Sequence, residues 1–144
     1  MKKYILILTL ILSSLSFAQN YEMAFSRIEQ AFSTSSPEIL WPLFSSRMTI
    51  RTEDSLYQDI SSIQSESVLN AFFLDKDSVE FRFAGTFAYN RTAEGNGVLT
   101  YVVDKRKVST NVDVYLNNYR GDALISAINI SNYPSSTAFY NFNN

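Results

Sequence analysis

Apolar positions in the first half of the chain recur at helical spacing. The segment 21–32 carries apolar residues three or four positions apart with charged residues between them, which predicts an amphipathic helix. A second helix is expected from Pro37, because proline suits the first helical turn. Pro42 should kink or end this helix near Trp41, since proline removes a backbone donor and clashes with the preceding turn. A third helix is predicted for 65–73.

The second half of the chain changes to a period of two. In 79–89, apolar residues alternate with polar and small ones, which predicts a half-buried strand. Gly85 in the middle of this strand predicts a bulge or bend. The segment 53–63 is polar and is expected to form turns. Further strands are predicted at 48–52, 97–104, 108–119 and 122–130.

This order of elements predicts an α+β domain. Helices followed by a meander of strands favour N-terminal helices packed on one face of a strongly curved antiparallel sheet. We expect one domain over 19–132, followed by an aromatic and Asn-rich tail at 133–144. The tail is expected either to be loose or to lie on the sheet.

The segment 1–18 has the layout of a secretory signal peptide. Lys2 and Lys3 precede a short apolar run, and a small-residue pattern ends at Ala18, which predicts cleavage between Ala18 and Gln19. The apolar run is shorter than the roughly 20 residues of a spanning helix, so no stable membrane anchor is expected after cleavage. We therefore expect export through the inner membrane of a bacterium, to the periplasm or beyond.

Composition excludes several kinds of chemistry. The chain has neither Cys nor His, which removes disulfides, thiol catalysis and the commonest general base and metal ligand. The net charge of −2 becomes −4 without the two signal-peptide lysines, leaving ten basic against 14 acidic residues. This mild acidity gives no reason to expect nucleic acid as a partner. No cofactor and no metal site are predicted.

The succession of elements resembles the nuclear transport factor two-like superfamily. The pattern "IEQAFSTSSPEILWPLFSSRMTI" followed by "SVLNAFF" is similar to one branch, an exported bacterial family called domain of unknown function family 4783. The resemblance covers about 21–130 and implies a cone-shaped fold with a pocket between the helices and the sheet. Relatives in the superfamily include isomerases, cyclases and dehydratases, and also proteins that only bind, so the fold alone does not choose between them.

The residues expected to line this pocket or to fill it as core are mostly aromatic. An enzyme there would need a tuned general base and a hydrogen-bond donor for developing negative charge. Tyr101 and Asp104 are the candidate pair, although Tyr101 also suits a core position, and Asp104 and Asp113 are expected to be solvated. The predicted pocket or core set is Trp41, Phe44, Phe72, Phe81, Phe83, Phe87, Tyr101 and Val112.

Two triplets are candidate modification sites. Asp54-Ser55-Leu56 and Asp77-Ser78-Val79 resemble the acceptor of a periplasmic O-glycosylation system of some bacteria. Asp and Ser are also ordinary turn residues, which is the reading that we favour for both triplets.

Three classes of function remain open. We favour an exported, non-catalytic domain that binds a small apolar ligand or a protein partner. The first alternative is an isomerase or lyase of the polyketide-cyclase or ketosteroid-isomerase type, and the second is a structural component of the cell surface. Tyr115 and Tyr119 are expected on the polar side of their strand, and such exposed aromatic residues favour a homodimer through the sheet face.

Overall fold

The computed structural model describes residues 20–132. The predicted signal peptide (1–18), its cleavage point at Ala18 and Gln19, and the tail (133–144) lie outside the described residues. A helix over residues 20–33, here called the N-terminal helix, precedes the other elements. These are η1 (Pro37–Leu43), β1 (Phe44–Arg51), β2 (Leu56–Ile60), α2 (Ser62–Phe73), β3 (Asp77–Tyr89), β4 (Thr92–Val103), β5 (Arg106–Tyr119) and β6 (Asp122–Ser131).

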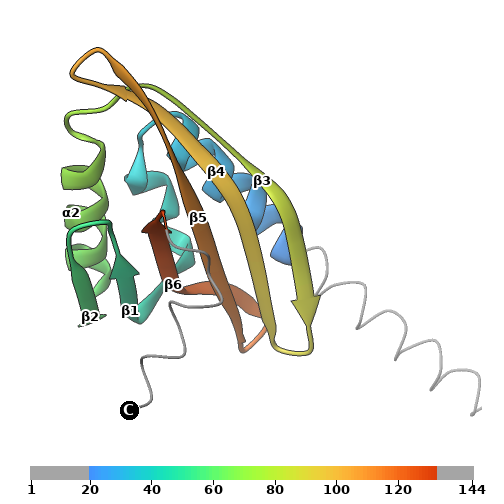
Figure 1. Cartoon of the computed structure of the whole chain (residues 1–144). Coiled ribbons are helices and arrows are strands. Elements are labelled where there is room, and N and C mark those ends of the chain that lie inside the picture. Colours follow the sequence, from blue (N-terminus) through green and yellow to red (C-terminus); the bar gives the residue numbers. More distant parts are fainter. Residues whose placement is uncertain (1–19, 133–144) are drawn as a thin grey trace, which may run out of the picture.

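The strands form one six-stranded sheet in the order β2-β1-β6-β5-β4-β3 (Figure 1). Neighbouring strands are antiparallel except β1 and β6, which are parallel. The sheet is therefore mixed, and the prediction of a purely antiparallel sheet was wrong. The reason is that β1 precedes the whole meander, and the last strand, β6, returns to lie beside β1 in the same direction.

The four long strands β3–β6 are joined by tight turns that the sequence suits. Strand pairing closes at Tyr89 with Thr92, at Val103 with Arg106 and at Tyr119 with Asp122, so each turn has two residues. Asp104 and Lys105 both adopt positive φ angles, as a type I′ hairpin turn requires. Asp104 is thus explained as a turn residue.

The helices cover one face of the sheet, here called the inner face. The N-terminal helix lies across the long strands in Figure 1 and buries an apolar stripe against them. This stripe confirms the helix predicted for 21–32, and its buried members are Tyr21, Ala24, Phe25, Ile28, Ala31 and Phe32. The sheet contributes alternate residues of β4, β5 and β6 to the same continuous core.

The second helix is a short 3-10 helix. Pro37 stands at its start as predicted, and Pro42 lies inside it and removes a backbone donor. The tight, short form displaces Trp41 from the core: 45% of its surface is exposed, so its assignment to the pocket or core was wrong. Its indole N–H donates to Glu66 of α2 instead.

The third helix, α2, forms close to its predicted bounds. Ser61 caps it, because its hydroxyl accepts from the backbone N–H of Gln64 while the Gln64 side chain accepts from Ser61. The polar segment before it contains β2, a strand where the sequence pattern predicts turns. Four of the five β2 residues are exposed, so this edge strand lacks the alternation of buried residues that would reveal it.

A bulge divides β3 in two. Phe83 lies opposite Gly97 and Gly85 lies opposite Asn96, so Ala84 is an extra residue without a partner of its own. Because side chains alternate, the extra residue moves every later side chain of β3 to the other face of the sheet. Phe81 and Phe83 therefore face the helices. Phe87 faces away from them and is 63% exposed, which corrects its assignment to a pocket or core between the helices and the sheet.

The described residues have the predicted α+β architecture. None of the helices in residues 20–132 is long and apolar enough to cross a membrane.

Candidate functional site

A row of aromatic rings occupies the space between the helices and the sheet. Phe25 meets Phe83 with ring centroids 5.0 Å apart, and Phe32 meets Phe81 at 5.2 Å, both edge to face. The row continues from Phe32 to Phe73 of α2, with ring centroids 5.4 Å apart. Rings that pack edge to face at these distances act as core.

Two glycines of β4 allow these rings to approach the sheet closely. A Cβ atom on Gly97 would lie 2.3 Å from the Arg82 carbonyl oxygen and 2.8 Å from the Phe81 ring. A Cβ atom on Gly95 would lie 2.7 Å from the ring of Phe83. The positions where a pocket-lining side chain of β4 would project are thus taken by phenylalanine rings.

Most of the predicted pocket or core residues belong to this core. Phe44, Phe81, Tyr101 and Val112 are buried, and Phe72 and Phe83 are partly buried against the same cluster.

The two candidate catalytic residues, Tyr101 and Asp104, lie in different environments. Tyr101 is 4% exposed and faces inward, and its ring meets Phe72 edge to face at 6.1 Å. Burial raises the pKa of the Tyr101 hydroxyl, with smaller contributions from the charges of Glu53, Asp75 and Asp54. Asp104 is exposed in the β4–β5 turn.

A lysine closes the end of the aromatic row beside Tyr101. The Lys76 ammonium group lies 4.2 Å from the centre of the Phe72 ring and 5.1 Å from that of Tyr101. It also donates to the Phe72 carbonyl at 2.6 Å and to the Asp75 carboxylate at 2.9 Å. This ion pair lowers the pKa of Asp75. Two rings and one carboxylate therefore hold a cation at this position.

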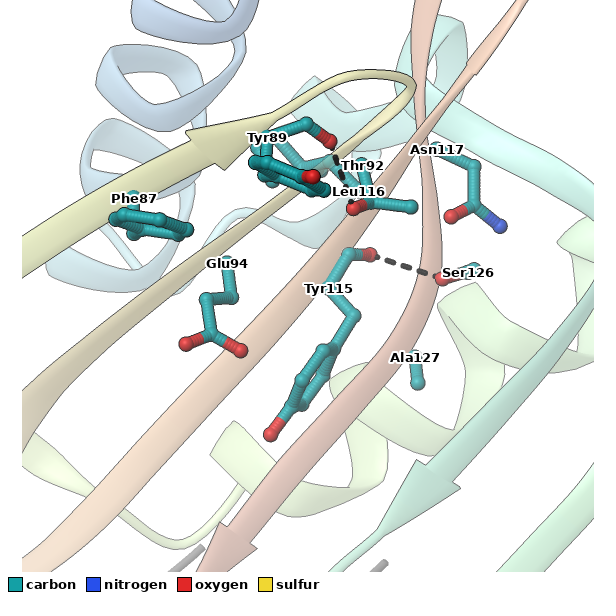
Figure 2. A pocket seen from close by; sticks show the side chains of 10 residues that line it. Phe87, Tyr89, Thr92, Glu94, Tyr115, Leu116, Asn117, Ser126 and Ala127 are labelled. Carbon is teal, nitrogen blue, oxygen red and sulfur yellow. Dashed lines mark hydrogen bonds between the residues drawn. The ribbon is translucent and has the colours of Figure 1, made fainter.

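The opposite face of the sheet, here called the outer face, carries a groove of about 490 Å³. Figure 2 shows the side chains of Phe87, Glu94 and Tyr115 on this face, with the N-terminal helix behind the sheet. We call this hollow the outer groove. Its lining residues come from β3, β4, β5 and β6 and are Phe87, Tyr89, Thr92, Ala93, Glu94, Tyr115, Leu116, Asn117, Ser126 and Ala127.

The strand register explains how these residues come together. Phe87 is paired with Glu94, Glu94 with Tyr115, and Tyr115 with Ala127, so these four form one row across four strands. Directly paired residues on one face place their Cβ atoms about 4.5–5.5 Å apart. Tyr89 stands in the next row, paired with Thr92.

Two acidic residues, Glu94 and Asp113, influence the pKa values in the middle of the outer face. Burial, helped by the charges of Asp113 and Glu94, raises the pKa of Tyr115 to about 12. Asp113 lies in the neighbouring row, accepts from Asn129 at 3.1 Å and is only 6% exposed, so the expectation that it is solvated was wrong. Burial raises the pKa of Asp113, the Asn129 hydrogen bond opposes this rise, and the charge of Glu94 adds to it.

Other hollows suit a ligand less well. One of about 620 Å³ follows the edge of β3 and is lined by charged side chains of both signs, Glu80 and Arg82. Two more, of about 340 and 220 Å³, lie along the N-terminal helix. In the described part of the chain, no group of three or more His, Cys, Asp or Glu residues is placed to hold a metal ion.

The sequence pattern predicts only part of the outer groove. It placed Tyr115 and Tyr119 on the outer face, and the structure confirms this for both, with Tyr119 58% exposed. Glu94 escapes the sequence prediction because the predicted strand begins at Gly97 and leaves out residues 92–96, which belong to β4. The signal was the alternation of Glu94, Asn96 and Val98 with smaller residues.

Comparison with known proteins identifies the fold. No family model and no curated protein matches this sequence. Among solved structures, a DUF4783 family protein from Bacteroides uniformis is similar with a TM-score of 0.67 and 14% identity, covering 76% of this chain and 97% of that one. A DUF4783 family protein from Bacteroides ovatus has a TM-score of 0.65, also at 14% identity, covering 76% and 94%.

An NTF2-like protein of unknown function from Shewanella oneidensis is also similar, with a TM-score of 0.60 at 9% identity, covering 79% and 98% of the two chains. The fold is therefore NTF2-like, as the sequence resemblance implied, and its structural neighbours include DUF4783 family proteins. These identities establish the fold alone.

Proposed function

We propose that this chain is an exported, non-catalytic binding domain that holds a small ligand in the outer groove. The observation that carries the proposal is that the two faces of the sheet have opposite roles to those that the resemblance implies. Phenylalanine rings fill the inner side, where the superfamily resemblance implies a pocket, whereas exposed rings line a groove on the outer side. The inner rings are buried or partly buried against one another and leave little surface for a ligand, whereas exposed rings gain free energy when they are covered.

The outer groove has the properties of a ligand site. Its volume of about 490 Å³ falls within the range of roughly 300–1,000 Å³ that is typical of small-molecule pockets. Phe87 and Tyr89 are 63% and 66% exposed, so they offer apolar surface, and Glu94 offers one charged group between them and Tyr115. All these residues stand on strands, which hold them in a fixed arrangement.

The proposal of a non-catalytic role rests on Tyr101 and Asp104. General acid–base catalysis needs the two groups within hydrogen-bond reach of one substrate. Tyr101 lies in the core and Asp104 lies in the hairpin turn, exposed to solvent. Export is proposed from the signal-peptide pattern of residues 1–18.

A homodimer through the outer face is a second candidate. Val98 and Tyr119 are exposed apolar residues on the same face, at 48% and 58%, and they extend the surface of Phe87 and Tyr89 beyond the groove. An apolar surface spread over several strands favours association between proteins.

Native mass spectrometry of the protein recovered from its own host tests both candidates. We expect the wild-type chain to carry a non-covalent small-molecule mass that the Phe87→Ser variant lacks. The Leu74→Ser variant is the matched control, because Leu74 is 87% exposed at the end of α2 and lies outside the groove. A dimer mass that only Phe87→Ser abolishes would support the second candidate. Bare monomers throughout, or an adduct that Phe87→Ser retains, would contradict a binding role of the outer groove.

A further inference from the structure

We infer that the outer groove selects an organic cation, an ammonium, quaternary ammonium or guanidinium group with an apolar body. This inference rests on the proposed function, because it names the ligand class of the same site. Its starting point is Glu94, an acidic side chain between two aromatic residues, where a groove for a neutral ligand would need no charge.

The strand register fixes the position of Glu94. Phe87 is its direct partner on β3 and Tyr115 its direct partner on β5, so its side chain rises between the two rings (Figure 2). Tyr89 stands one row away on the Phe87 side. A cation above the Glu94 carboxylate would therefore meet ring surface on both sides.

The charge of Glu94 is not balanced within the groove. The lining residues include Glu94 and neither Lys nor Arg. The next acidic residue, Asp113, is in the neighbouring row and pairs with Asn129, and Arg51 lies at the far end of that row, beyond Asn129. Between described residues, ion pairs join Arg47 to Asp59 and Lys76 to Asp75, and Glu94 belongs to neither pair.

The same chemistry already holds a cation elsewhere in this molecule. The Lys76 ammonium group lies over the rings of Phe72 and Tyr101 and contacts the Asp75 carboxylate. The outer groove presents the same set of groups, two rings and a carboxylate, without a lysine of its own. Ring faces attract cations through their quadrupole, and a neighbouring carboxylate adds charge attraction.

Two sources supply such a cation, a free small amine or the Lys or Arg side chain of a peptide. Both present the same chemistry to the rings and to Glu94. The outer groove is open along the sheet surface, so the experiment includes one probe for each source.

The test is an NMR titration of the ¹⁵N-labelled mature chain, residues 19–144, with choline and with 3,3-dimethylbutan-1-ol. The two probes have the same shape, but the alcohol has carbon in place of the charged nitrogen. We expect choline to shift the amide signals of Glu94 and Tyr115 and to bind at least about fivefold more tightly than the alcohol. Glu94→Gln should reduce choline binding to the level of the alcohol. Glu53→Gln, a change in an exposed loop, should leave it unaltered.

Each outcome decides the inference. Equal binding of both probes at the groove would overturn the cation preference while leaving the proposed binding function intact. Choline shifts that Glu94→Gln leaves unchanged, or no shifts at the groove with either probe, would also overturn it, and the native mass measurement would still judge the proposed function separately. A third probe, N-acetyl-lysine methylamide, distinguishes the sources: tighter binding than choline indicates a peptide side chain, and weaker binding indicates a free amine.

Discussion

The two halves of β3 belong to one strand but have opposite roles. Before the bulge, Phe81 and Phe83 face the helices and join the core. After it, Phe87 and Tyr89 face away and line the outer groove. One unpaired residue, Ala84, separates the halves. The difference teaches that a strand with a continuous apolar alternation can serve both core and surface when a bulge changes its phase.

The edges of the two halves differ as well. β3 is the last strand of the sheet, so its outward backbone groups have no neighbouring strand. In the first half, the N-terminal helix supplies partners: Glu29 accepts from the Phe83 N–H at 2.9 Å, and Ser33 donates to the Phe81 carbonyl at 3.0 Å. Such cover protects an edge strand from pairing with other chains. The helix thus fixes the core half.

The largest effect is expected from filling the glycine beside the core half. Gly97→Val would place a Cβ atom 2.3 Å from the Arg82 carbonyl oxygen, so β4 and β3 would have to separate. We expect a loss of about 3 kcal/mol or more in the free energy of unfolding, measured by urea denaturation. The control in the other half is Gly85→Ala, where the nearest atom would be 3.7 Å away, and a change within about 0.5 kcal/mol is expected. Equal losses in both variants would contradict the division of β3.

A smaller effect is expected from uncovering the edge. Glu29→Ala leaves the Phe83 N–H without its acceptor, and we expect a loss of about 1 kcal/mol in unfolding free energy. Glu22→Ala on the same helix is the control, since Glu22 is exposed. Faster hydrogen exchange at Phe83 in Glu29→Ala alone would support the assignment, and unchanged exchange would refute it.

A further loss of stability on the inner side is expected when the Lys76 ammonium group is removed from the end of the aromatic row. Lys76→Met keeps most of the apolar stem but removes the ammonium group from Phe72, Tyr101 and Asp75. We expect a loss of about 0.5–1 kcal/mol, measured by thermal or urea unfolding. A Lys105→Met variant, altered in the exposed hairpin turn, should show none. If both variants unfold alike, Lys76 does not stabilise the row.

The smallest effect concerns the ionisation of the outer face. The pKa of Tyr115 is raised to about 12 from the ordinary value of about 10, so the folded state favours the neutral phenol. This stabilisation is present below about pH 10 and is lost as the pH rises from there through 12. Ultraviolet titration should therefore show a late phenolate that Tyr115→Phe removes. Loss of an ordinary phenolate near pH 10 in that variant would contradict the burial of Tyr115.

The sequence predicted the elements with strong periodicity and failed where tertiary pairing decides. The alternation in 108–119 gave the correct inner face of β5, from Val108 to Leu116. Gly85 predicts the bulge. It does not predict that the later side chains of β3 change face, because this depends on which residue of β3 has no partner on β4. Phe87 was therefore placed on the wrong face. The parallel pairing of β1 with β6 joins residues too far apart in the chain for any local pattern to reveal.

The candidate site was the least predictable part. The proposed role of Glu94 depends on its cross-strand partners, Phe87 and Tyr115, which lie on two other strands. Asp113 looked solvated because it follows the polar side of β5, whereas neighbours in the fold bury it. Register sets both environments, and register is a property of the assembled sheet.

The most direct test of the account compares Phe81→Leu with Phe87→Leu in two measurements on each protein. Unfolding by urea reports the core, and native mass spectrometry of protein recovered from the host reports the bound ligand. The account predicts that Phe81→Leu lowers the free energy of unfolding by about 1–2 kcal/mol and keeps the ligand mass on the folded protein. Phe87→Leu should unfold like the wild type and lose most of that mass. Equal destabilisation by both variants, or full retention of the ligand by Phe87→Leu, would contradict the claim that one strand provides core before its bulge and binding surface after it.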